Sequence, residues 1–390
     1  MASFAVSALS KEEELHWLAL KLVSGLGTRR AFQLIERFRS PMAVFRASRS
    51  ELAGQGLPGT IAQSIESGCT FEDAVDQQQK MMACGAVLVP IFDPRYPPRL
   101  REIYDPPVVL FVRGRVELLQ STMLGVVGTR RPTAYGVAAT ERLSPDLSQA
   151  GLTIASGMAR GIDTSAHKSV LAIGGDTVAV FGCGVDQLYP VENKKLAAEI
   201  EKKGLLISEF PMGTPAYPQN FPIRNRIISG MSVGVIIIEG AQYSGSAITA
   251  KMAIDQQREV FAVPGSIMSK MSWGPNLLIK QGAKLVQEWN DVLVELPAEV
   301  RRQLIHKAQI RQGLLPLGET SEESTTSADS FSPDARKLLR EIKPDAPIHM
   351  DQLLETFEAM SSSEIIAALF ELEMLGLIRQ LPGRNFVRVW

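Results

Sequence analysis

Short apolar runs alternate with amphipathic stretches along the middle of this 390-residue chain. The runs are rich in β-branched residues and bounded by glycine or polar residues, which is typical of strands buried on both faces of a sheet. The stretches between them carry apolar residues at helical spacing, so the pattern predicts a doubly wound parallel sheet of the α/β class. The expected strands are residues 124–127, 152–155, 177–181, 205–208, 235–238 and 260–263, and the expected helices are residues 135–149, 164–173, 193–203, 225–232 and 246–257.

Two more strand-like runs precede this alternating region, at residues 86–92 and 108–112. The segment between them, DPRYPPRLREIYDPP, is rich in proline, which removes backbone donors and restricts the residue before it. We therefore expect a rigid, irregular connection between these two strands.

The N-terminal region, residues 15–65, shows helical spacing broken by glycines and predicts two helix–turn–helix units. The first turn, Gly25-Leu-Gly27, precedes a helix and leaves backbone amides available to hold a phosphate. Between Lys21 and Arg49 the chain has seven basic residues and one acid, a net charge of +6. Two interpretations stay open: contact with a DNA backbone, or a purely structural cap, because short glycine turns are also common packing devices.

The alternating pattern ends after Trp289. Residues 298–312 predict a polar helix, and residues 313–330 are rich in Ser, Thr and Glu, which is typical of a flexible linker. We divide the chain into a helical domain at 1–75, an α/β domain at 80–295, a flexible linker at 312–330 and a winged-helix domain at 331–390.

The winged helix is predicted from three helical segments followed by a hairpin. The third helical segment carries Glu364, Glu371 and Glu373 and no Lys or Arg. A helix that faces phosphates should not be acidic, so we expect this domain to contact a protein or to regulate rather than to bind DNA. The expected helices are residues 333–342, 350–357 and 361–375, and the expected hairpin strands are residues 377–380 and 386–389.

The amino-acid composition limits the cellular compartment and the kinds of partner that we expect. The net charge of −1 says nothing about nucleic acid, so any attraction must come from local patches. The three cysteines, Cys69, Cys84 and Cys183, are far apart and encode neither a disulfide framework nor a zinc site. The first residues lack a basic signal-peptide region, and no apolar segment is long enough to span a bilayer. We expect a cytoplasmic protein that does not act at a membrane.

Glycines, hydroxyls and arginines follow the expected strands at their carboxyl ends. The first strand of the alternating region leads into Gly-Thr-Arg130, and the next leads into Ser156-Gly157-Met-Ala-Arg160. Ligands of open α/β sheets bind at this edge, and small residues let a ligand approach the backbone amides. Four arginines are expected to converge there: Arg130, Arg160, Arg224 and Arg226.

The segment NFPIRNR, residues 220–226, combines an aromatic ring with two guanidinium groups. Arginine forks fit phosphate oxygens, and the ring of Phe221 can stack on a base. Asn225 adds an amide between Arg224 and Arg226. This segment predicts binding of an anionic ligand that carries bases.

A second polar turn follows the strand at 235–238. Gly245, Ser246 and Thr249 open the next helix, so backbone amides and hydroxyls are expected to point at the same edge of the sheet. A helix N-terminus of this kind favours anions.

Several enzyme classes are disfavoured by motifs that the sequence lacks. There is no G-x-x-x-x-G-K-[ST] loop, and Gly182-Cys-Gly184 lacks the third glycine of a dinucleotide fingerprint. Ser156 is not in a G-x-S-x-G nucleophile elbow, and His167 falls inside a helix, where a packed histidine is favoured over a member of a catalytic triad. No catalytic residue, metal or cofactor is therefore assigned.

Two carboxylates leave one enzymatic alternative open. Glu209 and Glu239 each end an expected strand, and a carboxylate pair above a nucleotide can cleave an N-glycosidic bond. We favour the structural alternative, in which each carboxylate orients an arginine or caps a helix.

Six segments together resemble the DNA-processing protein A family, DprA or Smf: GTRRPTAYG, SGMARGIDTSAHK, FGCGVDQLYP, SEFPMGTPAYPQNFPIRNRIISGMS, EGAQYSGSAITA and VPGSIMSKMSWGPNLLIKQGA. They cover nearly all of residues 124–286 in matching order and spacing. The resemblance implies an extended Rossmann-like domain that binds single-stranded DNA, forms a homodimer and helps load RecA recombinase during natural transformation, without established catalysis. It also implies a SAM-like N-terminal cap.

The resemblance also implies which residues form the DNA pocket. By motif match these are Arg130, Ser156, Gly157, Phe221, Arg224, Asn225, Arg226, Gly245, Ser246 and Thr249. Arg160 joins them as the fourth arginine at the sheet edge.

We thus expect a non-enzymatic protein that binds single-stranded DNA and hands it to a recombinase. The alternative is a Rossmann-like enzyme of the phosphoribohydrolase type. Those enzymes carry a P-G-G-x-G-T-x-x-E loop, and the corresponding segment after Glu239, GAQYSGSAIT, lacks its catalytic glutamate. A plain scaffold protein is disfavoured by the expected cluster of arginines.

Overall fold

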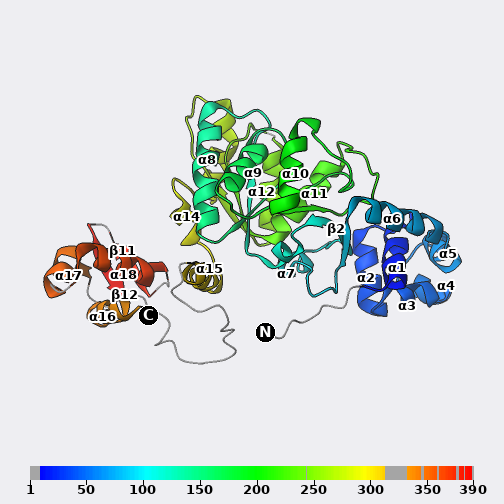
Figure 1. The fold of residues 1–390 in the computed structure, drawn as a ribbon, viewed down its shortest axis with the longest axis horizontal. Coiled ribbons are helices and arrows are strands. Elements are labelled where there is room, and N and C mark those ends of the chain that lie inside the picture. Colours follow the sequence, from blue (N-terminus) through cyan, green and yellow to red (C-terminus); the bar gives the residue numbers. More distant parts are fainter. Residues whose placement is uncertain are drawn as a thin grey trace. The chain divides into compact units, whose positions relative to one another are not determined.

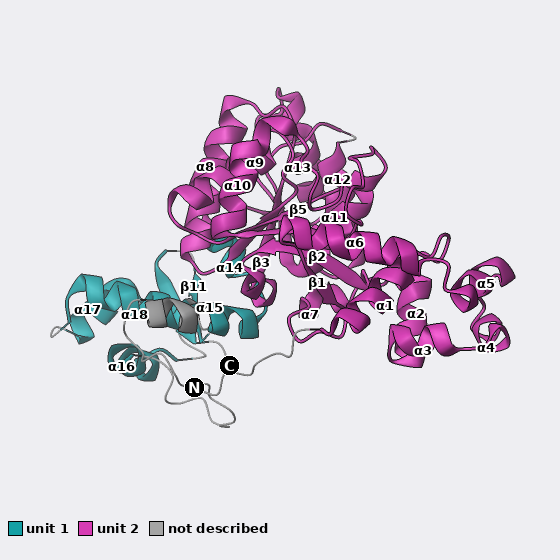
Figure 2. Cartoon of the chain, turned by 45° about the vertical axis from the view of Figure 1, so that its right-hand side comes forward, with its two compact units in different colours: residues 1, 290–390 teal, residues 2–289 magenta. Residues whose placement is uncertain are grey.

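The computed structural model describes residues 9–242, 244–311, 332–343, 347–357, 360–374, 377–381 and 383–388. The chain forms two compact units, residues 2–289 and residues 290–390 with residue 1 (Figure 2). The first unit contains the N-terminal helices and a large sheet, and the second contains a smaller C-terminal module. None of the helices in the described ranges has the length and apolar character needed to cross a membrane.

A nine-stranded sheet organises the first unit, in the order β1-β2-β6-β5-β4-β3-β7-β8-β9. It lies in the cyan to yellow part of the ribbon in Figure 1. The pairs β1–β2 and β2–β6 are antiparallel, and the remaining neighbours are parallel. The predicted doubly wound α/β fold is therefore confirmed. The strands are β1 Val87–Pro90, β2 Val109–Gly114, β3 Met123–Val127, β4 Thr153–Ser156, β5 Thr177–Val180, β6 Leu205–Ser208, β7 Ser232–Ile237, β8 Glu259–Ala262 and β9 Lys284–Leu285.

The strand order reverses between β3 and β7. From β3 the sheet grows through β4 and β5 to β6, and the chain then returns to add β7 on the other side of β3. Val126 of β3 pairs with Ile236 of β7 at this junction, and both side chains are fully buried. Such a switch point leaves a crevice at the carboxyl ends of the two strands, because their connections depart in opposite directions.

Helices cover both faces of the sheet. Helices α8, α9 and α10 pack side by side in one layer, while α11 and α12 pack together against β7 in the other. Two short helices were not predicted: α7 lies in the proline-rich spacer, and α13 follows β8. The bounds are α7 Pro98–Arg101, α8 Ala134–Gln149, α9 Ile162–Ala172, α10 Lys194–Lys203, α11 Asn220–Met231, α12 Gly245–Asp255 and α13 Trp273–Lys280.

The N-terminal helices share a hydrophobic core with the sheet region. Gly25 and Gly27 have φ values of 75° and 66° in the turn between the first two helices, a conformation that glycine adopts without strain. Residue 75, where the first predicted domain ends, lies inside α6, whose Gln77 donates to the carbonyl of Met212 in the sheet region. The helices are α1 Lys11–Leu22, α2 Thr28–Phe38, α3 Pro41–Arg46, α4 Arg49–Gly54, α5 Gly59–Ser67 and α6 Phe71–Cys84.

The second unit ends in a winged helix, as predicted. Three helices pack on an antiparallel sheet of order β10-β12-β11, and β10 is an additional two-residue strand. The predicted linker at 312–330 lies outside the described residues. The elements are α14 Trp289–Leu293, α15 Ala298–Arg311, α16 Pro333–Glu341, β10 Ile348–His349, α17 Met350–Thr356, α18 Ser362–Met374, β11 Ile378–Leu381 and β12 Asn385–Arg388.

The acidic residues of α18 are engaged within this module. Glu371 accepts hydrogen bonds from the backbone and hydroxyl of Ser332 at the start of α16, at 2.9 and 2.6 Å. Glu373 accepts from the amide of Gln380, and Glu364 forms a capping pair with Ser361. These carboxylates therefore support the fold of the winged helix as well as giving α18 its negative charge.

Candidate nucleic-acid interface

A pocket of about 650 Å³ lies at the switch point between β3 and β7. Its walls are the turn after β3, the start of α9, helix α11 and the first turn of α12. Seven of the predicted site residues line it: Arg130, Phe221, Arg224, Asn225, Gly245, Ser246 and Thr249. The structure thus brings together residues that are far apart in the sequence.

Helix α11 begins at Asn220, five residues before the predicted start. The expectation that Pro222 lies outside the helix is wrong, because proline is tolerated in the first turn, where its missing N–H has no intrahelical partner. Phe221 and Arg224 consequently lie three positions apart on one face of a helix. Both line the pocket.

Phe221 forms the aromatic wall of the pocket. Its ring lies against Tyr189, with centroids 5.4 Å apart and planes inclined by 41°. The guanidinium carbon of Arg130 lies 5.2 Å from the Phe221 centroid, and that of Arg224 lies 6.0 Å from it. This arrangement places two positive charges beside a surface that can stack on a base.

Three arginines line the pocket: Arg130, Arg131 and Arg224. The two beside the aromatic ring differ in burial. Arg130 is exposed, whereas Arg224 is only 3% exposed and donates from Nη1 to the carbonyl of Val180 at 3.1 Å. Burial lowers the pKa of Arg224, and the nearby Asp163 acts against that shift. The Nε of Arg224 has no hydrogen-bond partner among the described residues. Arg224 is therefore a fixed cation, and Arg130 is one that can move to meet a ligand.

A tight turn after β4 packs beside the guanidinium of Arg224. Asp163 accepts hydrogen bonds from the amides of Gly157 and Ala159 at 3.1 and 3.3 Å. Burial raises the pKa of Asp163, although Arg224 and the two amides favour the ionised form. A Cβ at Gly157 would overlap the guanidinium of Arg224, so only glycine leaves room for that side chain.

Arg160 lies at a small neighbouring cavity of about 20 Å³, which is also lined by Arg130, Gly157 and Phe221. Its Nη2 pairs with Glu192 at 2.5 Å, and both side chains are more than half exposed. An exposed pair of this kind is weak and readily exchanged for another anion. Arg160 is thus adjacent to the pocket rather than inside it.

Two predicted site residues do not face the pocket. Ser156 is fully buried and donates from its hydroxyl to the carbonyl of Val126 inside the sheet, so only the neighbouring Gly157 reaches a cavity wall. Arg226 is 6% exposed and points away from Arg224. The expectation that four arginines converge is therefore wrong for Arg226, because two helical positions separate the residues by about 200° around the helix axis.

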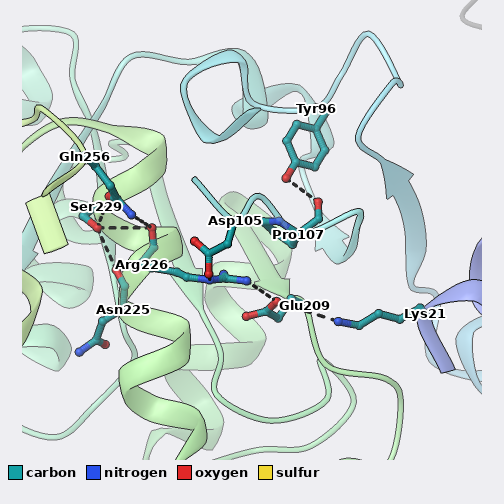
Figure 3. Close-up of polar contacts among 9 residues, drawn as sticks. All are labelled: Lys21, Tyr96, Asp105, Pro107, Glu209, Asn225, Arg226, Ser229 and Gln256. Atoms are coloured by element: carbon teal, nitrogen blue, oxygen red, sulfur yellow. Dashed lines mark hydrogen bonds and ion pairs between the residues drawn. The ribbon is translucent and has the colours of Figure 1, made fainter. Parts of the chain in front are cut away.

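Arg226 instead forms the centre of a buried charge cluster (Figure 3). Its Nη2 donates to Glu209 at 2.8 Å and its Nε donates to Asp105 at 3.0 Å. Lys21, from the end of α1, lies 4.0 Å from the same Glu209 oxygen. Burial lowers the pKa of Lys21, against the attraction of Glu209. The cluster joins the N-terminal helices to the face of α11 opposite the pocket.

The two strand-terminal carboxylates have structural partners, as the favoured alternative predicted. Glu209 orients Arg226, and Glu239 accepts from the amide and hydroxyl of Thr133 at 2.9 and 2.6 Å. Thr133 is the N-cap of α8, where a negative charge is favourable. Both carboxylates are buried, and neither lines the pocket.

The sequence interpretation missed Tyr189 and Asp163 as pocket residues. Tyr189 lies in the long connection between β5 and α10, and only the fold brings it against Phe221. Asp163 ends the S-G-M-A-R-G-I-D segment. An acid that follows a glycine turn and begins a helix is the sequence signal that could have identified it.

Two potentially reactive side chains near the sheet are held in unreactive forms. His167 is fully buried with Nδ1 2.7 Å from the hydroxyl of Thr177, and burial, aided by Arg224, lowers the pKa of His167 to about 3. Burial raises the pKa of Cys183 to about 12. At neutral pH these groups are a neutral imidazole and a protonated thiol, which fits packing roles.

The chain is similar in sequence to a known protein family. Residues 87–297 match the sequence model of the family described as DNA recombination-mediator protein A, and residues 322–384 match that of the DprA winged helix domain. The chain is 33% identical over 404 residues to Protein Smf of Synechocystis, covering 97% of this chain and all of that protein. It is 45% identical over 214 residues to the DNA processing protein DprA of Bacillus subtilis, covering 55% of this chain and 72% of that protein.

The fold is likewise similar to a solved structure. The X-ray structure of DNA processing protein A from Streptococcus pneumoniae superimposes with a TM-score of 0.66 at 34% sequence identity. The match covers 74% of this chain and 99% of that chain.

Proposed function

Because this chain belongs to the DNA recombination-mediator protein A family, we propose that its pocket between β3 and β7 binds single-stranded DNA. The observation that carries the proposal is the ring of Phe221 with the guanidinium groups of Arg130 and Arg224 beside it. A ring can stack on a base only when that base is not stacked within a duplex. The proposed contacts are those of Arg130, Arg160, Tyr189, Phe221, Arg224, Asn225, Gly245, Ser246 and Thr249.

The remaining walls of the pocket suit a polyanion. Gly245 and Ser246 form the first turn of α12, whose backbone amides and positive dipole end favour a phosphate. Ser244 and Ser246 add hydroxyls 2.7 Å apart. Asp163 is the one carboxylate among the residues that line the pocket, and its hydrogen bonds to two amides and its proximity to Arg224 offset its charge.

We propose that the protein is not an enzyme. The carboxylates that an N-glycosidase would use are occupied: Glu209 by Arg226 and Glu239 by Thr133. Freeing either of them would leave a buried cation or a helix end without its partner. Among its described lining residues, the pocket therefore offers binding groups and no general acid or base that is free to act.

This proposal includes delivery of the bound strand to RecA during natural transformation and homodimer formation, which rest on the family resemblance. It also includes a cytoplasmic location, which rests on the three scattered cysteines. The names of the relatives, DNA processing protein and recombination mediator, agree with a role before recombination. For the winged helix, the acidic surface of α18 supports contact with a protein.

A binding and turnover assay on the full chain tests the proposal. We expect a labelled single strand to bind more tightly than the matched duplex, mononucleotides to compete poorly, and neither ATP nor nucleoside monophosphates to be hydrolysed. Hydrolysis of a nucleoside monophosphate that is lost in Glu239→Gln would favour the phosphoribohydrolase alternative.

The recombinase step needs its own assay. DNA-dependent ATP hydrolysis by RecA, started on a strand already covered by a single-stranded-DNA-binding protein, should begin sooner when this chain is added. A Phe221→Ala, Arg130→Gln variant should lose that effect. An unchanged lag with the parent protein would remove delivery to RecA and leave single-strand binding in place.

A further inference from the structure

The segment from Lys21 to Arg49, within the N-terminal helices, carries positive charge that the structure does not neutralise. Between Lys21 and Arg49 there are seven basic residues and one acid, Glu36. Lys21 is used in the buried cluster with Glu209, but the other six basic residues are exposed. Across the described part of the chain they form no ion pair and no side-chain hydrogen bond: Arg29, Arg30, Arg37, Arg39, Arg46 and Arg49.

Two of these arginines line a groove of about 550 Å³. Arg30, Gln33 and Arg37 lie on one face of α2, because they are three and four positions apart. The opposite wall is Gln55 and Leu57, from the connection between α4 and α5. The groove thus presents two guanidinium forks and two amides, and Glu36 is the only acid among the lining residues that the structure describes.

The charges at the start of α2 are not placed to stabilise the helix, although Arg37 lies in its last turn, where a cation is favourable. Its first turn contains Arg29 and Arg30 and no acid, at the end where the helix dipole is already positive. The N-cap, Gly27, supplies no side-chain hydrogen bond. An anion bound from outside would relieve both deficits.

Arg29 is the neighbour of the groove residue Arg30. Its side chain is held by an aromatic ring and keeps its N–H donors free of protein acceptors among the described residues. Its guanidinium carbon lies 3.5 Å from the centroid of the Tyr104 ring, a cation–π contact that leaves the N–H groups available. Tyr104 is 73% exposed. The stacked side chain is thus held ready at the surface, which reduces the entropy lost when it binds a ligand.

The α2 groove is polar and basic, as nucleic-acid interfaces are, and the apolar residues among its described lining, Leu34 and Leu57, are buried. Among the described residues 9–74, none of the large hydrophobic side chains is exposed. Protein interfaces have apolar or aromatic anchors at their centre, whereas nucleic-acid interfaces are polar and strongly basic. None of the described residues that line the groove is aromatic, in contrast to the pocket with Phe221. The guanidinium and amide donors of the groove match phosphate oxygens.

We propose that the α2 groove, formed by Arg30, Gln33, Arg37 and Gln55, is a second DNA contact that binds the phosphodiester backbone of DNA extending beyond the pocket. The inference rests on the proposed function for the identity of its ligand. The groove adds affinity that is independent of base identity, whereas the pocket selects a single strand.

The test is the salt dependence of DNA affinity for the full-length Arg30→Gln, Arg37→Gln variant. On a long single strand we expect the log–log slope to fall by about 1.4, from two contacts worth about 0.7 each, and on duplex DNA by about 1.8. A short oligonucleotide that fills only the pocket should bind with the parental slope. The melting temperature should not change, because both side chains are exposed and unpaired.

The control removes two charges elsewhere. Arg142→Gln, Lys168→Gln changes exposed residues of α8 and α9 and should keep the parental slope. A reduced slope confined to single strands or to duplexes identifies which DNA occupies the groove. Parental slopes on both DNAs, or an equal fall in the control, would overturn the proposal. An α2 variant that loses binding to polyglutamate but keeps its DNA binding would also overturn it, because the groove would then bind an acidic protein.

The same series separates this inference from the proposed function. Arg130→Gln, Phe221→Ala should weaken binding of the short oligonucleotide. If it does so while the α2 variant keeps its parental slopes, the groove proposal fails alone. If the pocket variant binds like the parent, the proposed function fails.

Discussion

Arg224 and Arg226 are two positions apart on α11 and point to opposite sides of that helix. Arg224 lies in the pocket, where it donates to the carbonyl of Val180 and flanks Phe221. Arg226 bonds to Glu209 and Asp105 in the cluster that also includes Lys21 of α1 (Figure 3). Helix α11 therefore connects the pocket to the N-terminal helices, and its two arginines should respond differently to mutation.

We expect Arg226→Ala to destabilise the protein without altering the salt dependence of DNA binding. Removing the guanidinium leaves Glu209, whose side chain is 2% exposed, with only a long contact to Lys21. Breaking a buried ion pair in this way costs about 3–5 kcal/mol. Urea denaturation measures the loss, and binding is measured at a temperature where the variant is folded.

The matched control is Arg160→Ala, which breaks the exposed pair with Glu192 and should leave the denaturation midpoint unchanged. An Arg226→Ala protein as stable as the parent, with a reduced salt slope, would mean that Arg226 contacts DNA after all.

Phe221→Ala should weaken binding of single-stranded DNA by about 1–3 kcal/mol and leave the salt slope nearly unchanged, because a stacked ring carries no charge. Phe221→Trp keeps a stacking face and should retain most of the affinity. Fluorescence anisotropy at several salt concentrations measures both quantities. Equal losses in the alanine and tryptophan variants would show that the ring does not act by stacking.

Substitutions at two glycines, Gly157 beside the pocket and Gly245 in its wall, should separate packing from ligand approach. A Cβ at Gly157 would overlap the guanidinium of Arg224, so Gly157→Ala should lower stability by about 1–3 kcal/mol and weaken DNA binding. A Cβ at Gly245 meets no atom of a described residue within 4 Å, so Gly245→Ala should keep the parental melting temperature. It should still reduce affinity if the DNA approaches the α12 turn, and parental affinity would exclude that approach.

Stability should fall as the pH drops below about 6.5, the usual pKa of histidine. Burial lowers the pKa of His167 to about 3 in the folded chain, so between these values only the unfolded chain takes up the proton. The free energy of unfolding then decreases by about 1.4 kcal/mol per pH unit, or about 2 kcal/mol between pH 7.5 and 5.0.

The comparison protein is His167→Gln, whose amide can still meet Thr177 but does not titrate. Its unfolding free energy should depend less steeply on pH in this range than that of the parent. Identical pH profiles for the two proteins would show that His167 is protonated in the folded state or is not buried.

The hydrophobic pattern is sufficient to predict β1 to β8, because each of these strands is an apolar run that the sheet buries. It does not predict β9, since Lys284 and Leu285 are both exposed and two residues give no periodicity. Nor does it place the start of α11, because Pro222 has the same sequence signal in the first turn of a helix as in a loop.

The candidate site was predictable where one motif supplied neighbouring residues, as with Phe221 and Arg224. It was not predictable where partners come from distant segments. Asp105 is 121 residues from Arg226, and no local pattern shows that this acid and Glu209 would enclose the guanidinium. The pairing of Tyr189 with Phe221 likewise depends on how the β5–α10 connection folds over the sheet edge.

The most direct test of the pocket as a DNA site is the salt dependence of single-strand affinity for Arg130→Gln, measured beside the parent by fluorescence anisotropy. Arg130 is exposed and forms no ion pair with another described residue, so its loss should not affect folding. We predict a parental melting temperature, weaker binding to every sequence, and a slope lower by about 0.7. A folded Arg130→Gln protein that binds single-stranded DNA with the parental affinity and slope would contradict the account.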